Sequence, residues 1–413
     1  SDVAVVGQFA DYRALGAVGS TTILVTLFTG FLIGMGSGVN VQVALGLGAK
    51  DDKTVEKTIH TAFLICAAIG IVIGVFCILF ARPMLQALHT KSDLIDAAVL
   101  YLKIYALGMP AMAVYNFGNG VLSAKGDTKS PLIYLAVAGV LNIILNLIFV
   151  IGFHLAAAGV AIASAIAQYV SMLLVMRNLL KRRDVCRLQI SKIQFHQDVA
   201  KGILLMGIPT GLQNAIFALA NLFVQRGVNY FYTIMVSGNA AATNADAIIF
   251  NVMSAFYTGC ASFVSQNRGA GNRERMKKSY LVALTYSFLI GLFLGACLFF
   301  GGRYFLRAFA TDRAVIDAGM ERIKIMAFAY SISAFMDCTI AASRGLGKSI
   351  GPMIIVMLGS CVFRIIWVYT IFAHFHTIPS LYLLYPFSWT LTAIAEIAYF
   401  IVQFRKVMPK SRI

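Results

Sequence analysis

Long apolar runs, each close to the length that crosses a bilayer, follow one another along almost the whole chain of 413 residues. Charged residues make up only 12% of the sequence, against about 25% in a typical soluble domain. The bilayer core offers no water, so each run of ~20 apolar residues must form a helix that satisfies its own backbone hydrogen bonds. We therefore expect spans near residues 20–45, 57–80, 96–122, 131–153, 156–179, 202–228, 240–266, 280–301, 314–342, 351–373 and 380–404.

The two halves of the chain repeat the same loop sequences at a nearly constant offset. Residues 48–58 return as residues 269–279, which are 221 positions later, and residues 125–130 return as residues 344–349, which are 219 positions later. Two halves with one hydropathy plan are typical of transporters whose halves rock about a site near the membrane midplane.

The segment Ser1–Ala10 is apolar but only half a span long, and no initiator Met precedes it. We therefore expect the chain to start inside the first of twelve helices. The predicted fold class is an all-α integral membrane protein with twelve transmembrane helices, the first truncated, in two pseudo-symmetric six-helix bundles. The long polar stretch between the two copies predicts an N-terminal bundle at residues 1–180, a cytoplasmic linker at 181–198 and a C-terminal bundle at 199–413.

The net charge of +17 is concentrated in alternate loops, in the linker and in the C-terminal tail. This is the positive-inside pattern, which marks orientation in a membrane. We therefore expect the lipid bilayer, and no nucleic acid, as a partner.

Motifs of soluble enzymes are incomplete in this sequence. Gly347-Lys348-Ser349 resembles the end of a phosphate-binding loop, but Ala342 stands where that loop requires Gly. No His-Glu-x-x-His pair is present. We therefore expect a protein that is not an enzyme and that holds no cofactor.

The loops and spans resemble the multidrug and toxic compound extrusion (MATE) family over nearly the whole chain. The segments that carry the resemblance are Ala14–Gly19, Gly48–Asp51, Gln266–Gly271, Gly207-x-Pro209 and Arg344-Gly345. Each segment is weak evidence alone. Their order along the chain and their repetition in both halves make the resemblance specific. The resemblance implies a secondary exporter driven by Na⁺ or H⁺.

The DinF-like branch of that family implies a coupling-ion site in the N-terminal half, and the corresponding positions here are Asp2, Asn142, Asn146 and Ser164. This chain departs from the branch because Asn146 replaces a carboxylate and Ser164 replaces Thr. Asp2 is then the one titratable group of the site, and Na⁺ at these residues is the one metal expected. The alternative is that Asn142 and Asn146 only hold helices together, as buried amides often do.

The C-terminal half has intramembrane charges of its own at Asp337, Arg364 and Glu396. An arginine in mid-span needs a carboxylate or carbonyl partner, and the two acids are the candidates. This set either tunes a substrate-facing site or forms a fixed structural ion pair. The span at 202–228 lacks the carboxylate that the NorM-like branch implies there. The predicted substrate cavity comprises Gln42, Asn116, Asn119, Asn214, Asn221, Asp337, Arg364 and Glu396.

These observations predict a monomeric antiporter of a prokaryotic plasma membrane. It would export amphipathic organic cations or drugs in exchange for Na⁺ or H⁺ by alternating access. The alternative is a lipid-linked oligosaccharide flippase of the same wider superfamily, which would be expected to have a strongly cationic cavity.

Overall fold

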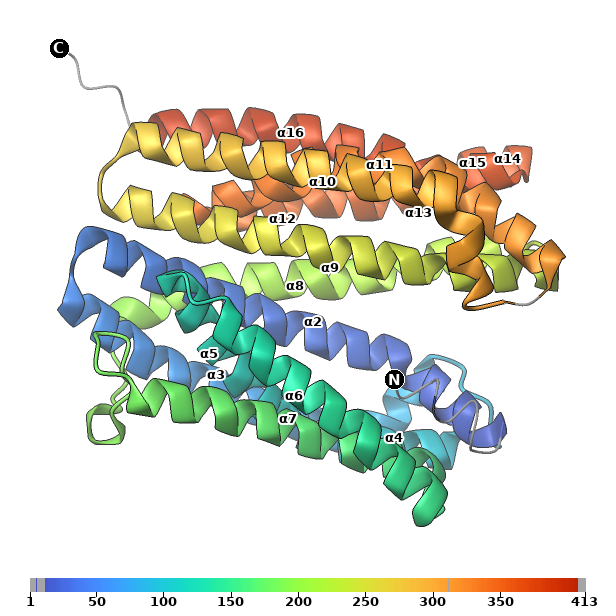
Figure 1. The fold of residues 1–413 in the computed structure, drawn as a ribbon, viewed down its shortest axis with the longest axis horizontal. Coiled ribbons are helices and arrows are strands. Elements are labelled where there is room, and N and C mark those ends of the chain that lie inside the picture. The colour runs from blue at the N-terminus through green and yellow to red at the C-terminus, as the bar shows by residue number, and fades with distance from the viewer. Residues whose placement is uncertain (1–4, 6–11, 311, 408–413) are drawn as a thin grey trace. The chain divides into compact units, whose positions relative to one another are not determined.

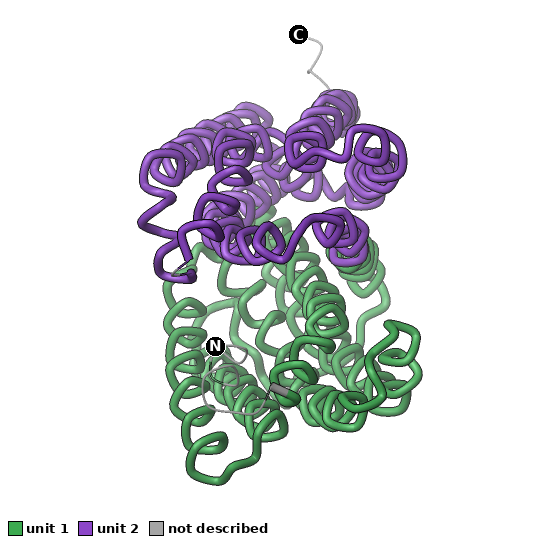
Figure 2. Tube along the Cα trace, turned by 90° about the vertical axis from the view of Figure 1, so that its right-hand side faces the viewer, with its two compact units in different colours: residues 1–215 green, residues 216–413 purple. Residues whose placement is uncertain are grey.

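The computed structural model describes residue 5, residues 12–310 and residues 312–407. The described part of the chain is built of helices and turns, without a β-strand (Figure 1). It divides into two compact units, Ser1–Ala215 (unit 1) and Ile216–Ile413 (unit 2), which Figure 2 colours separately.

Unit 1 contains a series of helices joined by short turns, as its apolar sequence predicts. They are α2 (Tyr12–Ala49), α3 (Asp52–Ala87), α4 (Ile95–Leu107), α5 (Met109–Lys125), α6 (Lys129–Leu147) with the π-helical segment η1 (Ile148–Gly152), α7 (Ala156–Lys181), the short η2 (Ile190–Lys192) and the first part of α8 (Gln197–Val228).

Unit 2 takes the end of α8 and continues with the second copy of the repeat. Its helices are α9 (Thr233–Gly269), α10 (Arg273–Arg307), α11 (Arg313–Gly345), α12 (Ile350–Val356), the π-helical η3 (Met357–Val362), α13 (Phe363–Trp367), the π-helical η4 (Val368–Phe372), α14 (Ala373–Phe375), α15 (Ile378–Tyr382) and α16 (Leu384–Val407).

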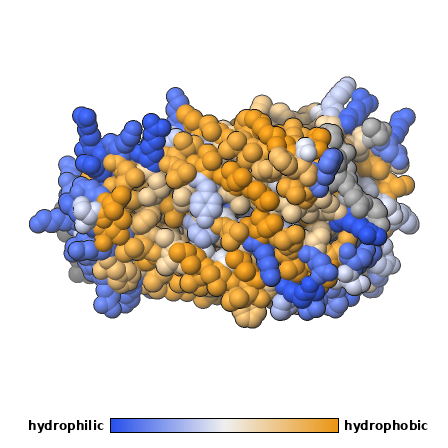
Figure 3. Space-filling model, turned by 90° about the horizontal axis from the view of Figure 1, so that it is seen from below, coloured by the Kyte–Doolittle hydropathy of each residue, from blue (hydrophilic) through white to orange (hydrophobic). Residues whose placement is uncertain are grey.

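The eleven expected spans correspond to helices in the structure. Ten helices are long and apolar enough to cross a membrane, and the bent pair α4–α5 makes an eleventh, within the residues searched. On the face shown in Figure 3, hydrophobic side chains cover the middle and hydrophilic ones gather towards both ends. The segment 1–10, where the first helix is expected, lies almost entirely outside the described residues.

The sequence repeat is also a repeat of backbone conformation. Asp51 caps the start of α3 by accepting a hydrogen bond from the backbone of Thr54, and Asn272, 221 positions later, caps α10 in the same way. The residues just before these caps, Lys50 and Gly271, both have a left-handed φ, of 54° and 68°. Glycine adopts this conformation without strain, whereas Lys50 must tolerate it. The tight turn is therefore retained even where its sequence differs.

Two local departures from regular helix were not expected from the apolar pattern. The predicted span 96–122 is broken at Gly108, where α4 and α5 meet at 43°. Pro110 explains the break, because proline is favoured in a first helical turn and disfavoured inside a helix. The second departure is π-helical structure, which occurs at 148–152 in the first copy of the repeat and at 357–362 and 368–372 in the second copy.

The polar stretch between the two copies packs against unit 1. Cys186 and Leu188 join the buried cluster that includes Val39, Phe117 and Leu179. Burial raises the pKa of the Cys186 thiol to about 11. The predicted boundaries at residues 181 and 199 stay predictions, since α8 is continuous and passes from one compact unit into the other.

Candidate functional site

Two helices of unit 1 carry a polar cluster in the middle of their apolar sequences. Asn142 and Asn146 lie one turn apart on α6, so their side chains share a helix face. Asn146 Nδ2 donates to Asn142 Oδ1 over 3.3 Å, and Asn142 Nδ2 donates to Ser164 Oγ on α7 over 3.1 Å. Asn146 and Ser164 are buried. The structure thus brings together three of the four residues predicted for the coupling-ion site.

This cluster has the chemistry of a small cation site but contains no acid of its own. Amide and hydroxyl oxygens are hard donors that can ligate Na⁺, and none of them changes charge at physiological pH. Asp2, which would supply the titratable group, lies outside the described residues. Within the described residues, no group of three or more His, Cys, Asp or Glu side chains could hold a metal ion.

Three of the amides predicted for the substrate cavity make hydrogen bonds within unit 1. Asn116 Nδ2 donates to a carbonyl one turn earlier on α5, and Asn119 Oδ1 accepts a hydrogen bond from Ser123. Asn214 Nδ2 on α8 donates to the carbonyl of Gly30 on α2 over 2.9 Å. The fourth, Gln42 on α2, lies against Gly202 of α8. These contacts fit helix packing as well as they fit substrate binding.

The contact between α2 and α8 is so close that it depends on glycine. A Cβ atom added at Gly34 would lie 2.3 Å from the backbone nitrogen of Gly211. Small residues at such positions let membrane helices approach in this way. The Asn214 side chain is therefore fixed at the seam between two tightly packed backbones.

Arg364 lies deep inside unit 2, with 2% of its surface exposed. Its guanidinium donates to Asn221 Oδ1 over 3.2 Å and faces the rings of Tyr385 and Phe217 at 4.8 and 5.5 Å. The expected ion pair with Asp337 or Glu396 is absent from the described residues. Its partners are an amide carbonyl and two π faces instead, while its Nε has no hydrogen-bond partner among the described residues.

Glu396 on α16 is the most enclosed acid in the described part of unit 2. It is 0% exposed, and neither carboxylate oxygen has a hydrogen-bond partner among the described residues. Arg344 and Asp337, both on α11, are the charged groups that act on it electrostatically. A buried acid without hydrogen bonds is costly to hold inside an apolar bundle, so Glu396 is a candidate functional residue.

A second buried arginine, Arg322, forms a polar network that was not predicted from the sequence. Arg322 is 3% exposed and pairs with Asp246 on α9. It also donates to Asn239 Oδ1 over 2.5 Å, while Tyr330 donates to Asp246 and Tyr382 donates to Asn239. The signal in the sequence was a pair of opposite charges inside two predicted spans, 240–266 and 314–342.

Tyr385 connects the two arginine sites of unit 2. Its ring lies 4.8 Å from the Arg364 guanidinium and 5.5 Å from that of Arg322. An aromatic face is attractive to a cation on each side, so one ring can lie between two like charges that would otherwise repel each other. The Arg364 site and the Arg322 network therefore share one aromatic ring.

Comparison with known proteins identifies the family. A family profile described as MatE matches residues 1–148 and 209–370, which is well over half of the chain. The chain belongs to the MatE family. The probable multidrug resistance protein YpnP of Bacillus subtilis is 26% identical to it over 79% of this chain and 73% of that protein. The FAD transporter of Shewanella oneidensis is 23% identical over 77% of this chain and 71% of that protein.

Solved MatE structures share the fold at low identity. An outward-facing multidrug resistance MATE transporter matches with a TM-score of 0.91 at 19% identity, over 98% of this chain and 91% of that chain. A transporter of the MOP superfamily from Pyrococcus furiosus matches with a TM-score of 0.90 at 18% identity, over 98% of this chain and 91% of that chain. These matches confirm the predicted all-α, twelve-helix class. With the family, they make this chain a multi-pass membrane transporter and not an enzyme.

Proposed function

We propose that this MatE protein is a secondary antiporter that exchanges Na⁺ or H⁺ for an exported solute by alternating access. The observation that carries the proposal is the hydrogen-bonded cluster of Asn142, Asn146 and Ser164 inside two apolar helices. Polar groups at this depth are costly, and they are usually functional. Asp2 is assigned as the titratable partner of the cluster, on the resemblance to the DinF-like branch.

The proposed substrates are amphipathic organic cations or drugs. Support comes from relatives named for multidrug resistance or export, including YpnP of Bacillus subtilis and MepA of Staphylococcus aureus. The relative named as an FAD transporter adds an anionic, phosphate-bearing solute to the set that should be tested. The proposed location is a prokaryotic plasma membrane, with the protein acting as a monomer.

The flippase alternative draws on the buried arginines of unit 2. A carrier of lipid-linked pyrophosphate needs cationic groups at its site. Arg322 is neutralised by Asp246, whereas Arg364 is held by an amide and two rings. Of these two buried arginines, Arg364 is therefore the one that the alternative could use. The antiporter remains the better supported function.

The test is dye export from proteoliposomes, with the Na⁺ and H⁺ gradients collapsed in separate experiments. We expect export to be lost when one of the two gradients is collapsed and to continue when the other is collapsed. Asp2→Asn should abolish gradient-driven export while leaving dye binding nearly intact, since binding does not require the coupling ion. Asp93→Asn, which changes an exposed acid, is the matched control. Full export by the Asp2 variant at equal protein level would contradict the assignment.

A further inference from the structure

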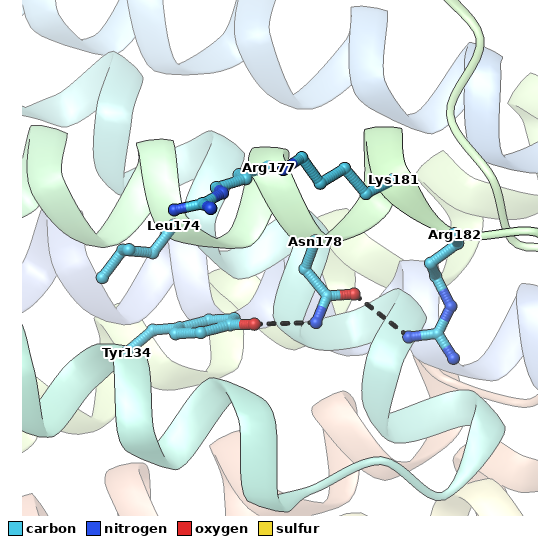
Figure 4. Close-up of a pocket in the computed structure, with 6 residues that line it drawn as sticks. All are labelled: Tyr134, Leu174, Arg177, Asn178, Lys181 and Arg182. Carbon is cyan, nitrogen blue, oxygen red and sulfur yellow. Dashed lines mark hydrogen bonds between the residues drawn. The ribbon is translucent and has the colours of Figure 1, made fainter.

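A basic pocket lies where the start of α6 and the end of α7 face each other. Its volume is about 390 Å³, and the residues that line it are Tyr134, Leu174, Arg177, Asn178, Lys181 and Arg182 (Figure 4). Three of these six side chains are cationic, and none is acidic. At the rise of an α-helix, Asn178 is about 20 Å along α7 from Ser164, so the pocket is separate from the polar cluster.

The base of the pocket is a short relay of hydrogen bonds. Asn178 Nδ2 donates to the Tyr134 hydroxyl over 2.7 Å, and Arg182 donates to Asn178 Oδ1 over 3.2 Å. Figure 4 shows the Asn178 amide between these two partners. Arg182 is also paired with Asp127 and Asp184, at 3.5 and 3.1 Å. Arg182 is therefore fixed and largely neutralised, and it shapes the pocket more than it charges it.

Arg177 and Lys181 give the pocket its charge. They lie one turn apart on α7, and both side chains are exposed. Neither makes an ion pair with a carboxylate in the described part of the chain. Two cations at this spacing repel each other slightly unless an anion lies between them. Phosphate oxygens accept charge-assisted hydrogen bonds from both types of side chain.

The helix face that leads to these cations is apolar and exposed. Ile166, Tyr169 and Leu173 are 37%, 41% and 60% exposed, and their spacing of three and four continues to Arg177 and Lys181. The helix belongs to a candidate membrane span, Ala156–Lys181. The stripe therefore faces hydrocarbon, with the cations at headgroup level. A ligand that joins a phosphate to a hydrocarbon chain fits this sequence of surfaces.

We propose that the pocket binds the headgroup phosphate of an anionic phospholipid of the phosphatidylglycerol class. Arg177 and Lys181 pair with the phosphate, and the headgroup hydroxyls occupy the space beside the relay. One acyl chain lies along Ile166 and Leu173. Basic pockets between helices on the cytoplasmic side are a known form of lipid recognition. The site stands independently of the antiporter proposal.

The test measures lipid binding to the purified full-length protein in detergent by native mass spectrometry. The probes are dioctanoyl phosphatidylglycerol, dioctanoyl phosphatidylcholine and glycerol 1-phosphate. R177Q/K181Q should bind phosphatidylglycerol about thirtyfold more weakly than the unaltered protein, because each cation near the surface contributes about one kcal/mol. K181Q alone should weaken binding about fivefold. The control, K277Q/K278Q, removes two exposed cations from the first turns of a different helix, α10, and should leave this affinity unchanged.

Three results would overturn the proposal. An equal loss in both double variants would mean that general surface charge attracts the lipid. Equal binding of phosphatidylcholine would mean that the net charge of the headgroup is not recognised. Binding of glycerol 1-phosphate as tight as that of the lipid would make the pocket a site for soluble phosphates. Both pairs are exposed, so the variants should fold, and their melting temperatures check this.

Discussion

The two units repeat one plan of helices, yet they differ in where each places its polar interior. In unit 1 the amides Asn142 and Asn146 lie in the second half of α6, and the equivalent positions of the second copy, 219 residues later, are Cys361 and Ile365. In unit 2 the polar centre is instead the charge network around Arg322 and Asp246. Each half therefore has a polar centre, but at a position where the other half is apolar.

The charge network of unit 2 shows the same division at other positions of the repeat. The equivalents of Asp246 and Arg322 in the first copy are Val25 and Tyr101, which belong to an apolar cluster of unit 1. The shared backbone thus accepts either a hydrophobic core or a buried ion network at equivalent sites. The two halves therefore share an architecture, whereas their polar residues stand at different positions of the repeat.

The largest expected effect comes from breaking the network of unit 2. Arg322→Met leaves Asp246 without its cation, and removing one partner of a buried pair costs about 3 kcal/mol. Tyr101→Phe, at the equivalent position of unit 1, should cost about 1 kcal/mol or less. Thermal unfolding in detergent measures both. Equal losses would mean that the two positions are alike after all.

A double variant sharpens this result. Replacing both partners, with Asp246→Leu and Arg322→Met, removes the buried charges together, and apolar replacements of buried ion pairs are often neutral or stabilising. The double variant should therefore be more stable than Arg322→Met alone. If it is less stable, the hydrogen bonds to Asn239 and Tyr330 matter more than the charge pair.

The second arginine of unit 2 should have a smaller effect. Arg364→Met removes one hydrogen bond and two cation–π contacts in a buried site, with an expected loss of about 2 kcal/mol. Arg226 is a matched control, since it likewise makes one hydrogen bond, to the Tyr369 hydroxyl, and faces that ring, but it is exposed. Arg226→Met should cost less than about 0.5 kcal/mol. Similar losses would show that burial does not distinguish the two sites.

A change in the amide cluster of unit 1 should alter the dependence of export on the coupling ion. Asn146→Asp adds a carboxylate to a site whose assigned acid is Asp2, and two close carboxylates resist ionising together. With proton coupling, the pH profile of dye export should move up by about one unit. With Na⁺ coupling, Na⁺ binding should tighten and the pH profile should stay. Gln197→Glu, which adds a carboxylate at an exposed position, is the control. A variant that changes neither dependence would leave Asn142 and Asn146 as helix packing alone.

The smallest expected effect concerns the end of unit 1 beside the linker. Burial alone would raise the pKa of Asp184, but hydrogen bonds from Lys125 and Arg182 outweigh it and lower that pKa below its usual 3.8. A lowered pKa stabilises the fold above pH 3.8, and this stabilisation is lost as pH falls through the folded-state value.

Asp184→Asn tests this linkage, because it removes the titrating group. The variant should lose less stability than the unaltered protein between about pH 5 and about pH 3, by less than about 1 kcal/mol. Melting temperatures across that range measure it. Unit 2 has Gln403 at the equivalent position of the repeat, so no matching effect is expected there. Identical pH curves for both proteins would exclude the contribution.

The spans were predictable because the hydrocarbon core imposes length and apolarity directly on the sequence. The helices extend beyond the predicted limits, as α2 does, because backbone hydrogen bonding continues into the headgroup region where polar residues are tolerated. Pro110 is a local signal for the break between α4 and α5, but the pattern of hydrophobicity alone does not reveal this break. A π turn leaves no apolar signature at all.

The site was predictable only in part. Asn142 and Asn146 could be paired from spacing on one helix, and Ser164 followed from family resemblance. A prediction of the pair between Arg322 and Asp246 would have required knowing that α11 packs against α9, and no local sequence pattern states this. The partner of Arg364 was misjudged for the same reason, since an amide and two rings satisfied a charge for which the sequence suggested an acid.

The repeated π segment also relates the two halves of the chain to each other. Such a segment closes its hydrogen bonds over one residue more than an α-helix does. It occurs at 148–152 and again at 368–372, so both halves contain this extra residue towards the end of matching helices. The segment at 357–362 has no counterpart among the described residues of unit 1, and it lies shortly before Arg364. Within the described residues, the irregular helix around this buried arginine therefore distinguishes the second half from the first.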